Sequence, residues 1–342
     1  MRRIAIEEAF VTEAIAEQWQ KVIADPNANE PGFKKMGEAL LCDSPPARRL
    51  HEQLADLGTG RIRAMDEAGI DIQVLSITSP GVQVFQAELA TELARDANEQ
   101  LAKAVKNHPD RFVGLAAVAP QQPEAAAMEI ERAVGSLGMR GVIINSHTGG
   151  EYLDNRKYRP MLEAAEATGF PIYLHPRTPS HKIIDPFLDF GLYFAGWGFA
   201  ADSGLHAMRL IMSGVFDRFP KLKIILGHMG EGIPFWLDRI DNRYLLQVKL
   251  GAVEAMKRLP SDYFRENFVI TTSGMPFEAP FMLACQTLGA ERILFAADYP
   301  YESMGEAVAF MDAAAIPEED LHLIYHGNAE KMFEIPAGRP LF

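Results

Sequence analysis

Short apolar runs recur along the chain, and each is followed by a segment with the spacing of an amphipathic helix. Leu89, Leu93, Ala97 and Leu101, for example, recur every four residues and so occupy one helix face. Short apolar runs rich in β-branched residues predict strands. Strands are predicted at eight segments: 3–9, 72–78, 112–119, 141–145, 171–175, 223–228, 268–273 and 292–298.

The predicted strands are apolar along their length, without alternation between apolar and polar residues. This pattern is typical of parallel strands that helices bury on both faces. Eight such units predict an α/β fold, a closed (β/α)8 barrel with a helical ring, although a doubly wound sheet would show the same alternation. No repeat or linker divides the chain, so one domain over residues 1–342 is the simplest interpretation.

Two stretches interrupt the alternation of strands and helices. The first, about residues 11–60, contains a predicted helix, a loop around 27–33 and a second segment that begins at Ser44. The second, 181–198, is rich in aromatic residues and glycine. In a barrel these inserts follow the first and fifth strands and lie in βα loops, where active sites are built and covered.

Composition argues against several classes of function. The 342 residues include 33 Lys+Arg and 46 Asp+Glu, and the formal net charge of −13 without a basic cluster argues against binding to nucleic acid. Two cysteines, Cys42 and Cys285, are too few for a disulfide framework or a cysteine zinc site. No apolar run approaches the about 18 residues of a membrane span, and no leader is evident. We expect a soluble, cytoplasmic protein that binds no membrane.

Ionisable side chains stand at the carboxyl ends of four predicted strands. They are Glu7, His175, Asp298 and His228, which is followed by Glu231. The carboxyl ends of parallel strands meet at one mouth of a barrel, and this mixture of carboxylate and imidazole suits zinc or manganese. One such residue alone is more often structural, but four at corresponding positions favour a metal site.

Four motifs resemble those of a known family: IEEAF at 6–10, YLHP at 173–176, LGHMGE at 226–231 and ADYPY at 297–301. With them the chain resembles the amidohydrolase superfamily, in its branch of metal-dependent, non-oxidative aromatic acid decarboxylases. The resemblance covers nearly the whole chain. It implies a distorted (β/α)8 barrel, one manganese or zinc ion per chain without an organic cofactor, and a homodimer or homotetramer.

The resemblance also implies roles for individual residues. Glu7, His175 and Asp298 match metal ligands, and His228, with Glu231 as its partner, matches a residue near the substrate. Many superfamily members have a histidine where this chain has Ala9, which leaves a coordination position for substrate or water. Further positions align with residues that contact the aromatic acid: Arg48, Thr78, Phe199, Arg239 and Tyr301.

The implied reaction is decarboxylation of an ortho-hydroxylated benzoate, such as 5-carboxyvanillate or γ-resorcylate, to the phenol and CO2. Asp298 or His228 could protonate the ring; we favour Asp298, with His228 and Glu231 on the phenolic side. One alternative is a metal-dependent hydrolase, in which Asp298 deprotonates the water that attacks a lactone, amide or ring-cleavage product. Another is a non-catalytic barrel that binds an acidic ligand.

Overall fold

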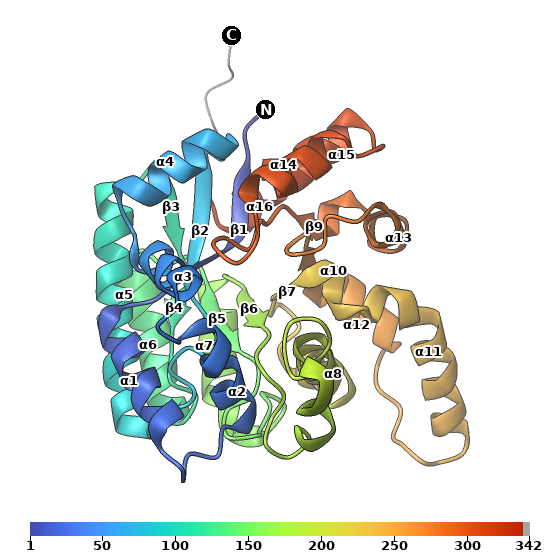
Figure 1. The fold of residues 1–342 in the computed structure, drawn as a ribbon. Coiled ribbons are helices and arrows are strands. Elements are labelled where there is room, and N and C mark those ends of the chain that lie inside the picture. The colour runs from blue at the N-terminus through green and yellow to red at the C-terminus, as the bar shows by residue number, and fades with distance from the viewer. Residues whose placement is uncertain (338–342) are drawn as a thin grey trace.

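The computed structural model describes residues 1–337, in which parallel strands are surrounded by helices (Figure 1). Residues 338–342 of the domain expected over 1–342 lie outside the described residues. Every predicted strand is found, although the third is divided in two. The strands are β1 (Ile4–Phe10), β2 (Ile72–Ile77), β3 (Phe112–Gly114), β4 (Ala116–Ala117), β5 (Val142–Asn145), β6 (Ile172–His175), β7 (Ile224–Leu226), β8 (Phe268–Thr271) and β9 (Ile293–Leu294).

The strands pair in sequence order, and all of the pairs are parallel. They form two sheets, β1-β2-β3 and β4 to β9. The break between β3 and β4 falls at Leu115, whose N–H still donates to Leu75 O at 2.9 Å. The ends of the ring are joined by backbone hydrogen bonds from Ile6 N to Phe295 O (3.1 Å) and from Ala9 N to Tyr299 O (2.8 Å). This unreversed order is that of a distorted (β/α)8 barrel, whereas a doubly wound sheet reverses its strand order.

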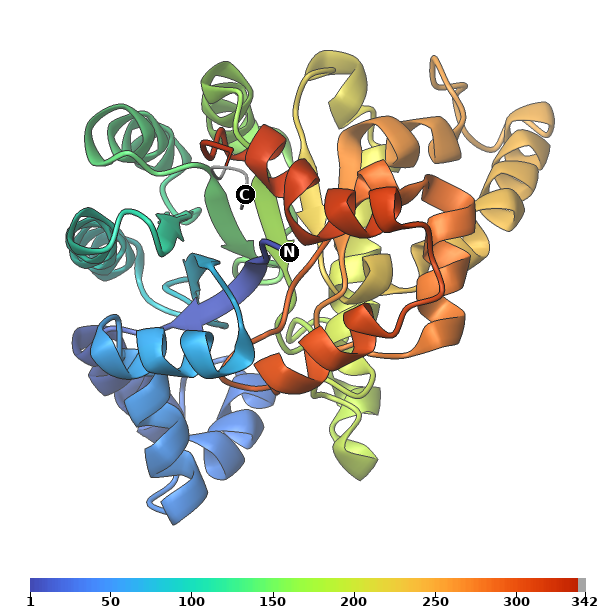
Figure 2. The same ribbon diagram turned by 90° about the horizontal axis from the view of Figure 1, so that it is seen from above.

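Helices cover the outside of the strands (Figure 2). None of the helices within residues 1–337 has the length and apolar character needed to cross a bilayer. The helices outside the first insert are α4 (Thr59–Ala68), α5 (Ala87–Asn107), α6 (Pro123–Leu137), α7 (Arg159–Thr168), α8 (Gly198–Met212), α9 (Val215–Arg218), α10 (His228–Glu231), α11 (Ile233–Lys249), α12 (Pro260–Asn267), α13 (Glu278–Leu288), α14 (Met304–Asp312), α15 (Glu318–His322) and α16 (Asn328–Met332).

The sequence explains where these helices pack and where they end. In α5 the face formed by Leu93, Ala97 and Leu101 is buried, as its four-residue spacing predicts. Helix α6 ends at Gly138, whose φ of 74° is a left-handed conformation that glycine adopts without steric cost. The strands inside are buried throughout, as β1 illustrates, so the core lies between the strands and the helical layer.

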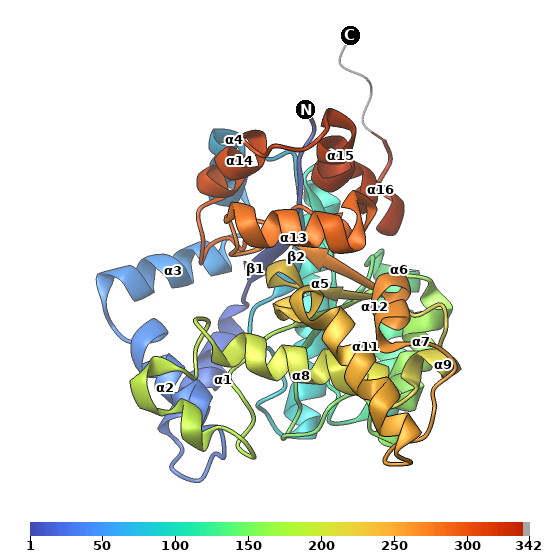
Figure 3. The ribbon, with the colours of Figure 1, turned by 90° about the vertical axis from the view of Figure 1, so that its right-hand side faces the viewer.

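The first insert is a group of three helices, α1 (Glu13–Ala24), α2 (Pro31–Leu40) and α3 (Pro45–Ala55), which lie together on one side of the barrel (Figure 3). The loop expected around 27–33 is shorter than predicted, because Pro31 begins α2 and Phe33 is helical. Proline suits this position, since the first N–H groups of a helix have no partner within it. The second insert forms the short helices η2 (Asp185–Phe187) and η3 (Asp189–Gly191) before α8.

Candidate active site

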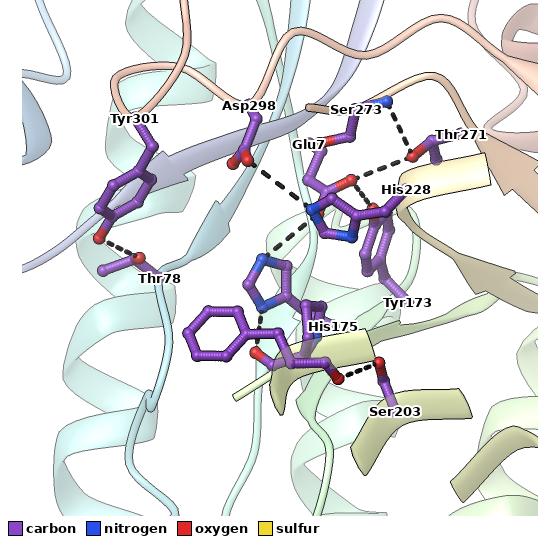
Figure 4. A network of polar contacts seen from close by, with 12 residues as sticks. Glu7, Thr78, Tyr173, His175, Ser203, His228, Thr271, Ser273, Asp298 and Tyr301 are labelled. Carbon is purple, nitrogen blue, oxygen red and sulfur yellow. Dashed lines mark hydrogen bonds and ion pairs between the residues drawn. The ribbon is translucent and has the colours of Figure 1, made fainter. Parts of the chain in front are cut away.

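The ionisable residues at the four strand ends converge at one mouth of the barrel (Figure 4). Glu7 comes from β1 and His175 ends β6, while His228 and Asp298 follow β7 and β9. One ligand atom each from Glu7, His175 and Asp298 lie within 4.8 Å of one another. The Nε2 atom of His228 is 3.7 Å from Glu7 Oε1 and 3.8 Å from Asp298 Oδ2. The geometry therefore brings all four side chains to one point.

The carboxylate of Glu7 is buried and held from one side. Its Oε2 atom accepts hydrogen bonds from the Tyr173 hydroxyl and from Thr271 Oγ1, the latter at 3.0 Å. Its Oε1 atom has no hydrogen-bond partner among residues 1–337, although it is shielded from solvent. A buried carboxylate oxygen without a donor is costly, so this atom requires a positively charged or hydrogen-bonding partner.

The orientation of His175 shows which partner fits. Its Nδ1 lies 2.8 Å from the carbonyl oxygen of Pro176, so Nδ1 carries the hydrogen and Nε2 carries a lone pair. Burial lowers the pKa of His175, although Glu7 opposes this effect, and the neutral ring is favoured. Nε2 lies 3.3 Å from Glu7 Oε1, so two acceptor atoms face each other. A divalent cation that both atoms ligate satisfies this arrangement.

The backbone around Asp298 is held by a second buried glutamate. Asp298 has a φ of 67°, which is unusual for a residue other than glycine. The N–H groups of Ala297 and Tyr299, on either side of it, donate to Glu8 at 3.0 and 3.3 Å. Burial raises the pKa of Asp298 to about 7, against the opposing effect of the nearby His228. Glu8 thus fixes the turn that presents Asp298, and the Asp298 carboxyl binds a proton more readily than an ordinary aspartate.

His228 forms a pair with Glu231 one turn later. Its Nδ1 lies 3.0 Å from Glu231 Oε1, and the Glu231 side chain is buried. His228, Met229 and Glu231 all have positive φ angles, so the segment after β7 is a tight turn. Burial lowers the pKa of His228, but the carboxylates of Glu7 and Glu231 outweigh burial and raise it well above its ordinary value. This imidazole is therefore able to carry a positive charge at the mouth of the barrel.

A cavity of about 290 Å³ opens beside these residues. Thr78 and Tyr301 lie on one side of it, with their oxygens 2.7 Å apart (Figure 4). Phe199 lines the same cavity, and its ring packs edge-on against that of Phe194 at 5.3 Å between centroids. The remaining wall is largely apolar, with Met36, Leu40, Leu50, Ala195 and Pro300. The cavity has room for one substituted aromatic ring.

Two residues expected to contact the substrate do not line this cavity within the single chain. Arg48, in the first turn of α3, pairs with the exposed Asp43 and lines a separate cavity of about 430 Å³. Arg239 lies on α11 and is exposed to solvent. Among the described residues, neither arginine lines the cavity beside Asp298. Leu50 of α3 does line the cavity, but the Arg48 side chain on the same helix lies at the separate cavity.

The sequence reasoning missed the residues that support the ligands. Tyr173 precedes His175 by two residues in β6, and alternate residues of a strand share a face, so its contact with Glu7 was predictable. The role of Glu8 was not, because β1 has an irregular register between Ala5 and Glu8. Adjacent residues of a strand point to opposite faces, and Glu8 accordingly contacts the backbone around Asp298 while Glu7 lies among the candidate metal ligands.

Comparison with known proteins identifies the family of this chain. The sequence profile of the amidohydrolase family matches residues 45–335. The chain is 40% identical over 296 residues to γ-resorcylate decarboxylase of Polaromonas sp. (strain JS666 / ATCC BAA-500), covering 84% of this chain and 90% of that protein.

Two solved structures are also similar to this chain. The 5-carboxyvanillate decarboxylase of Sphingomonas paucimobilis is 41% identical, with a TM-score of 0.94 over 98% of this chain and 99% of that one. The 5-carboxyvanillate decarboxylase of Novosphingobium aromaticivorans, complexed with manganese and 4-hydroxy-3-methoxy-5-nitrobenzoic acid, is 39% identical, with a TM-score of 0.95 over 98% and 96%. The chain therefore belongs to the amidohydrolase family, in its branch of metal-dependent aromatic acid decarboxylases.

Proposed function

We propose that this chain removes the carboxyl group of a benzoate that carries a hydroxyl ortho to it, with Glu7, His175 and Asp298 as ligands of one divalent cation. The observation that carries the proposal is the pair of facing acceptors, Glu7 Oε1 and His175 Nε2, 3.3 Å apart in a buried site. Manganese is favoured because it is bound in the similar Novosphingobium enzyme. Zinc accepts the same mixture of ligands and is the alternative.

The three protein ligands leave room for the substrate. When bound, a divalent cation supplies a Lewis acid that orients the carboxylate and phenolic oxygens of the acid and stabilises negative charge on them. Phe199 lines the space for the aromatic ring, and the hydroxyls of Thr78 and Tyr301 offer hydrogen bonds to a polar ring substituent. The ring is therefore held beside Asp298 and His228.

The residues of the chain then account for the proton transfer. The Asp298 carboxyl gives its proton to the ring carbon that bears the carboxylate, which breaks the aromaticity of the ring. The bond to the carboxylate breaks, CO2 leaves, and the bonding electron pair restores the aromatic ring. His228, paired with Glu231 at 3.0 Å, donates a hydrogen bond to the phenolic side and so stabilises the charge of the intermediate. Water restores the proton of Asp298 after the products leave.

We also propose that the chain works as a homodimer or homotetramer. Helix α11, which carries Arg239, exposes Phe235, Trp236 and Leu246, and Leu250 directly after the helix is exposed as well. Exposed apolar side chains grouped in this way are typical of a subunit contact, and a second copy of the chain would cover them. In such an assembly Arg239 would lie at the contact between subunits, where it could reach a neighbouring site.

The predicted cytoplasmic location is part of the same proposal. Cys42 and Cys285 are both free thiols, which suits a reducing compartment. The proposed substrate is a small aromatic acid, and the net charge of −13 disfavours nucleic acid as a partner.

A panel of hydroxylated benzoates tests the proposed reaction. Manganese-loaded protein is incubated with each acid, and ultraviolet absorbance and released CO2 are recorded. Acids with an ortho hydroxyl should lose CO2, whereas acids with only a para hydroxyl should not, because they lack the second oxygen needed for chelation. Hydrolysis of a lactone or amide with every ortho-hydroxybenzoate left intact would contradict the proposal.

A further inference from the structure

A buried ion pair joins the first insert to the strand end that carries His175. Arg177 lies two residues after His175, and its side chain is 0% exposed. Its Nη2 donates to Oε2 of Glu30, the residue at the N-terminal cap of α2, and its Nη1 donates to His147 O at 3.3 Å. This pair connects a segment far away in the sequence to the metal-binding end of β6.

The backbone of α2 also lies close against the Thr178 side chain. A Cβ atom on Gly32, in the first turn of α2, would lie only 2.7 Å from Thr178 Cβ, so the helix rests directly on the segment after Arg177. The next residue, Phe33, is buried and packs edge-on against Trp19 at 5.9 Å between ring centroids. Trp19 in turn donates to Gly81 O at 2.9 Å, close to Thr78 in the wall of the cavity. Helix α2 thus packs against the segment after Arg177 on one side and against Trp19 of α1 on the other.

The far half of α2 forms part of the cavity itself. Met36 and Leu40 line the cavity together with His175, Thr78 and Tyr301. Both lie on the side of the ring-binding space that is contributed by the insert, whereas the metal ligands come from the barrel strands. A shift of α2 would therefore change the shape of the wall without moving Glu7 or Asp298.

We propose that Glu30 is a positioning residue for substrate recognition: its ion pair with Arg177 fixes α2, and hence the apolar wall formed by Met36 and Leu40, at the distance that an aromatic acid requires. Apolar packing alone tolerates small shifts of a helix, but a buried guanidinium without its carboxylate is strongly unfavourable. The pair thus defines one position for the insert. This inference rests on the aromatic acid site proposed above.

The test compares two glutamates of the same region. In Glu30→Gln the buried pair loses its negative charge. In the control Glu38→Gln, the change removes the exposed Lys35–Glu38 pair, 3.5 Å apart on the same helix. A third variant, Glu30→Asp, keeps the charge and shortens the side chain, so it should restore part of what Glu30→Gln loses.

Two binding measurements distinguish an effect on the cavity wall from an effect on the metal ligands. Binding of Mn²⁺ is measured first, and binding of 4-hydroxy-3-methoxy-5-nitrobenzoic acid to the manganese-loaded protein second. Glu30→Gln should keep its affinity for Mn²⁺ and lose about tenfold or more in affinity for the acid, with Glu38→Gln close to wild type in both. With a turned-over acid, KM should rise far more than kcat falls. Amide hydrogen exchange in residues 31–40 should become faster in Glu30→Gln alone.

The possible outcomes distinguish the two proposals. If the wild-type protein binds Mn²⁺ but no aromatic acid, the proposed function is wrong. If the wild-type protein binds the acid and Glu30→Gln binds it equally well, the inference alone is wrong. Equal losses of Mn²⁺ and acid affinity in Glu30→Gln would also overturn it, because Glu30 would then act through His175 rather than through α2.

Discussion

The Nδ1 atom of His228 lies 3.0 Å from Oε1 of Glu231, and this contact fixes the orientation of the imidazole. Its Nε2 consequently points towards Glu7 and Asp298, at 3.7 and 3.8 Å. Glu231 is buried, so its negative charge favours the protonated ring. In the proposed mechanism the pair donates a hydrogen bond to a substrate oxygen while the three proposed ligands hold the cation.

Replacement of His228 should separate catalysis from metal binding. His228→Asn keeps a polar side chain but cannot carry a charge, so kcat should fall by about 10² to 10⁴-fold. The manganese content should stay near that of the wild type, because His228 is outside the proposed ligand set. Glu231→Gln, which keeps the shape of the partner, should reduce kcat less. A His228→Asn protein with wild-type kcat would show that the pair is structural.

The metal site makes a separate prediction. Protein purified without chelator should contain close to one manganese or zinc ion per chain by elemental analysis, and Asp298→Ala should be sharply depleted. Tyr173→Phe removes the hydroxyl that holds Glu7 Oε2, so its affinity for Mn²⁺ should fall by about 10 to 100-fold. Full activity in a metal-free preparation would refute the ligand assignment.

Stability should decrease in acid because of buried neutral histidines. His206 is buried, its Nε2 accepts the Leu153 N–H at 2.8 Å, and burial lowers its pKa from 6.5 to about 3. Between these two values the unfolded chain binds a proton that the folded chain does not, so the free energy of unfolding falls as the pH falls from 6.5 towards 3. His147 is shifted in the same direction.

Urea unfolding of the metal-free protein at several pH values measures this effect. In His206→Gln the free energy of unfolding should depend less on pH over that range, by about one proton. An unchanged pH dependence would show that His206 is not the source of the effect, because it is already protonated in the folded chain or because other groups bind the proton.

Assembly is tested by light scattering at working concentration. The exposed Phe235 and Trp236 on α11, with the exposed Leu250 directly after the helix, predict a dimer or larger species. Trp236→Glu places a charge in this apolar group and should shift the protein towards a monomer. Met128→Glu, at a single exposed apolar residue of α6, is the matched control and should not. A wild-type protein with the mass of one chain would contradict the predicted contact.

Much of the barrel was predictable because buried parallel strands have a simple pattern. Continuous apolar runs located every strand, and the ends of those runs located His175, His228 and Asp298, whereas Glu7 lies within β1. Local interruptions were not predictable from the same pattern. The break at Leu115 and the early start of α2 at Pro31 depend on hydrogen bonds and packing between distant segments.

The site was less predictable where its residues come from helices. Thr78 and Tyr301 follow strands, and the structure brings them together at 2.7 Å. Arg48 and Arg239 lie on helices, where a shift of one residue turns a side chain by about 100°. Their distance from the cavity could not be derived from spacing along the chain.

The central claim is that this chain protonates the ring carbon from which it removes CO2. The most direct measurement runs the manganese-loaded enzyme with an ortho-hydroxybenzoate in heavy water and analyses the phenol by NMR and mass spectrometry. The account predicts release of CO2 and one deuterium at the carbon that carried the carboxylate. In Asp298→Asn neither the CO2 nor the deuterated phenol should form. Unchanged acid, or a hydrolysis product that contains an oxygen atom from water, would contradict it.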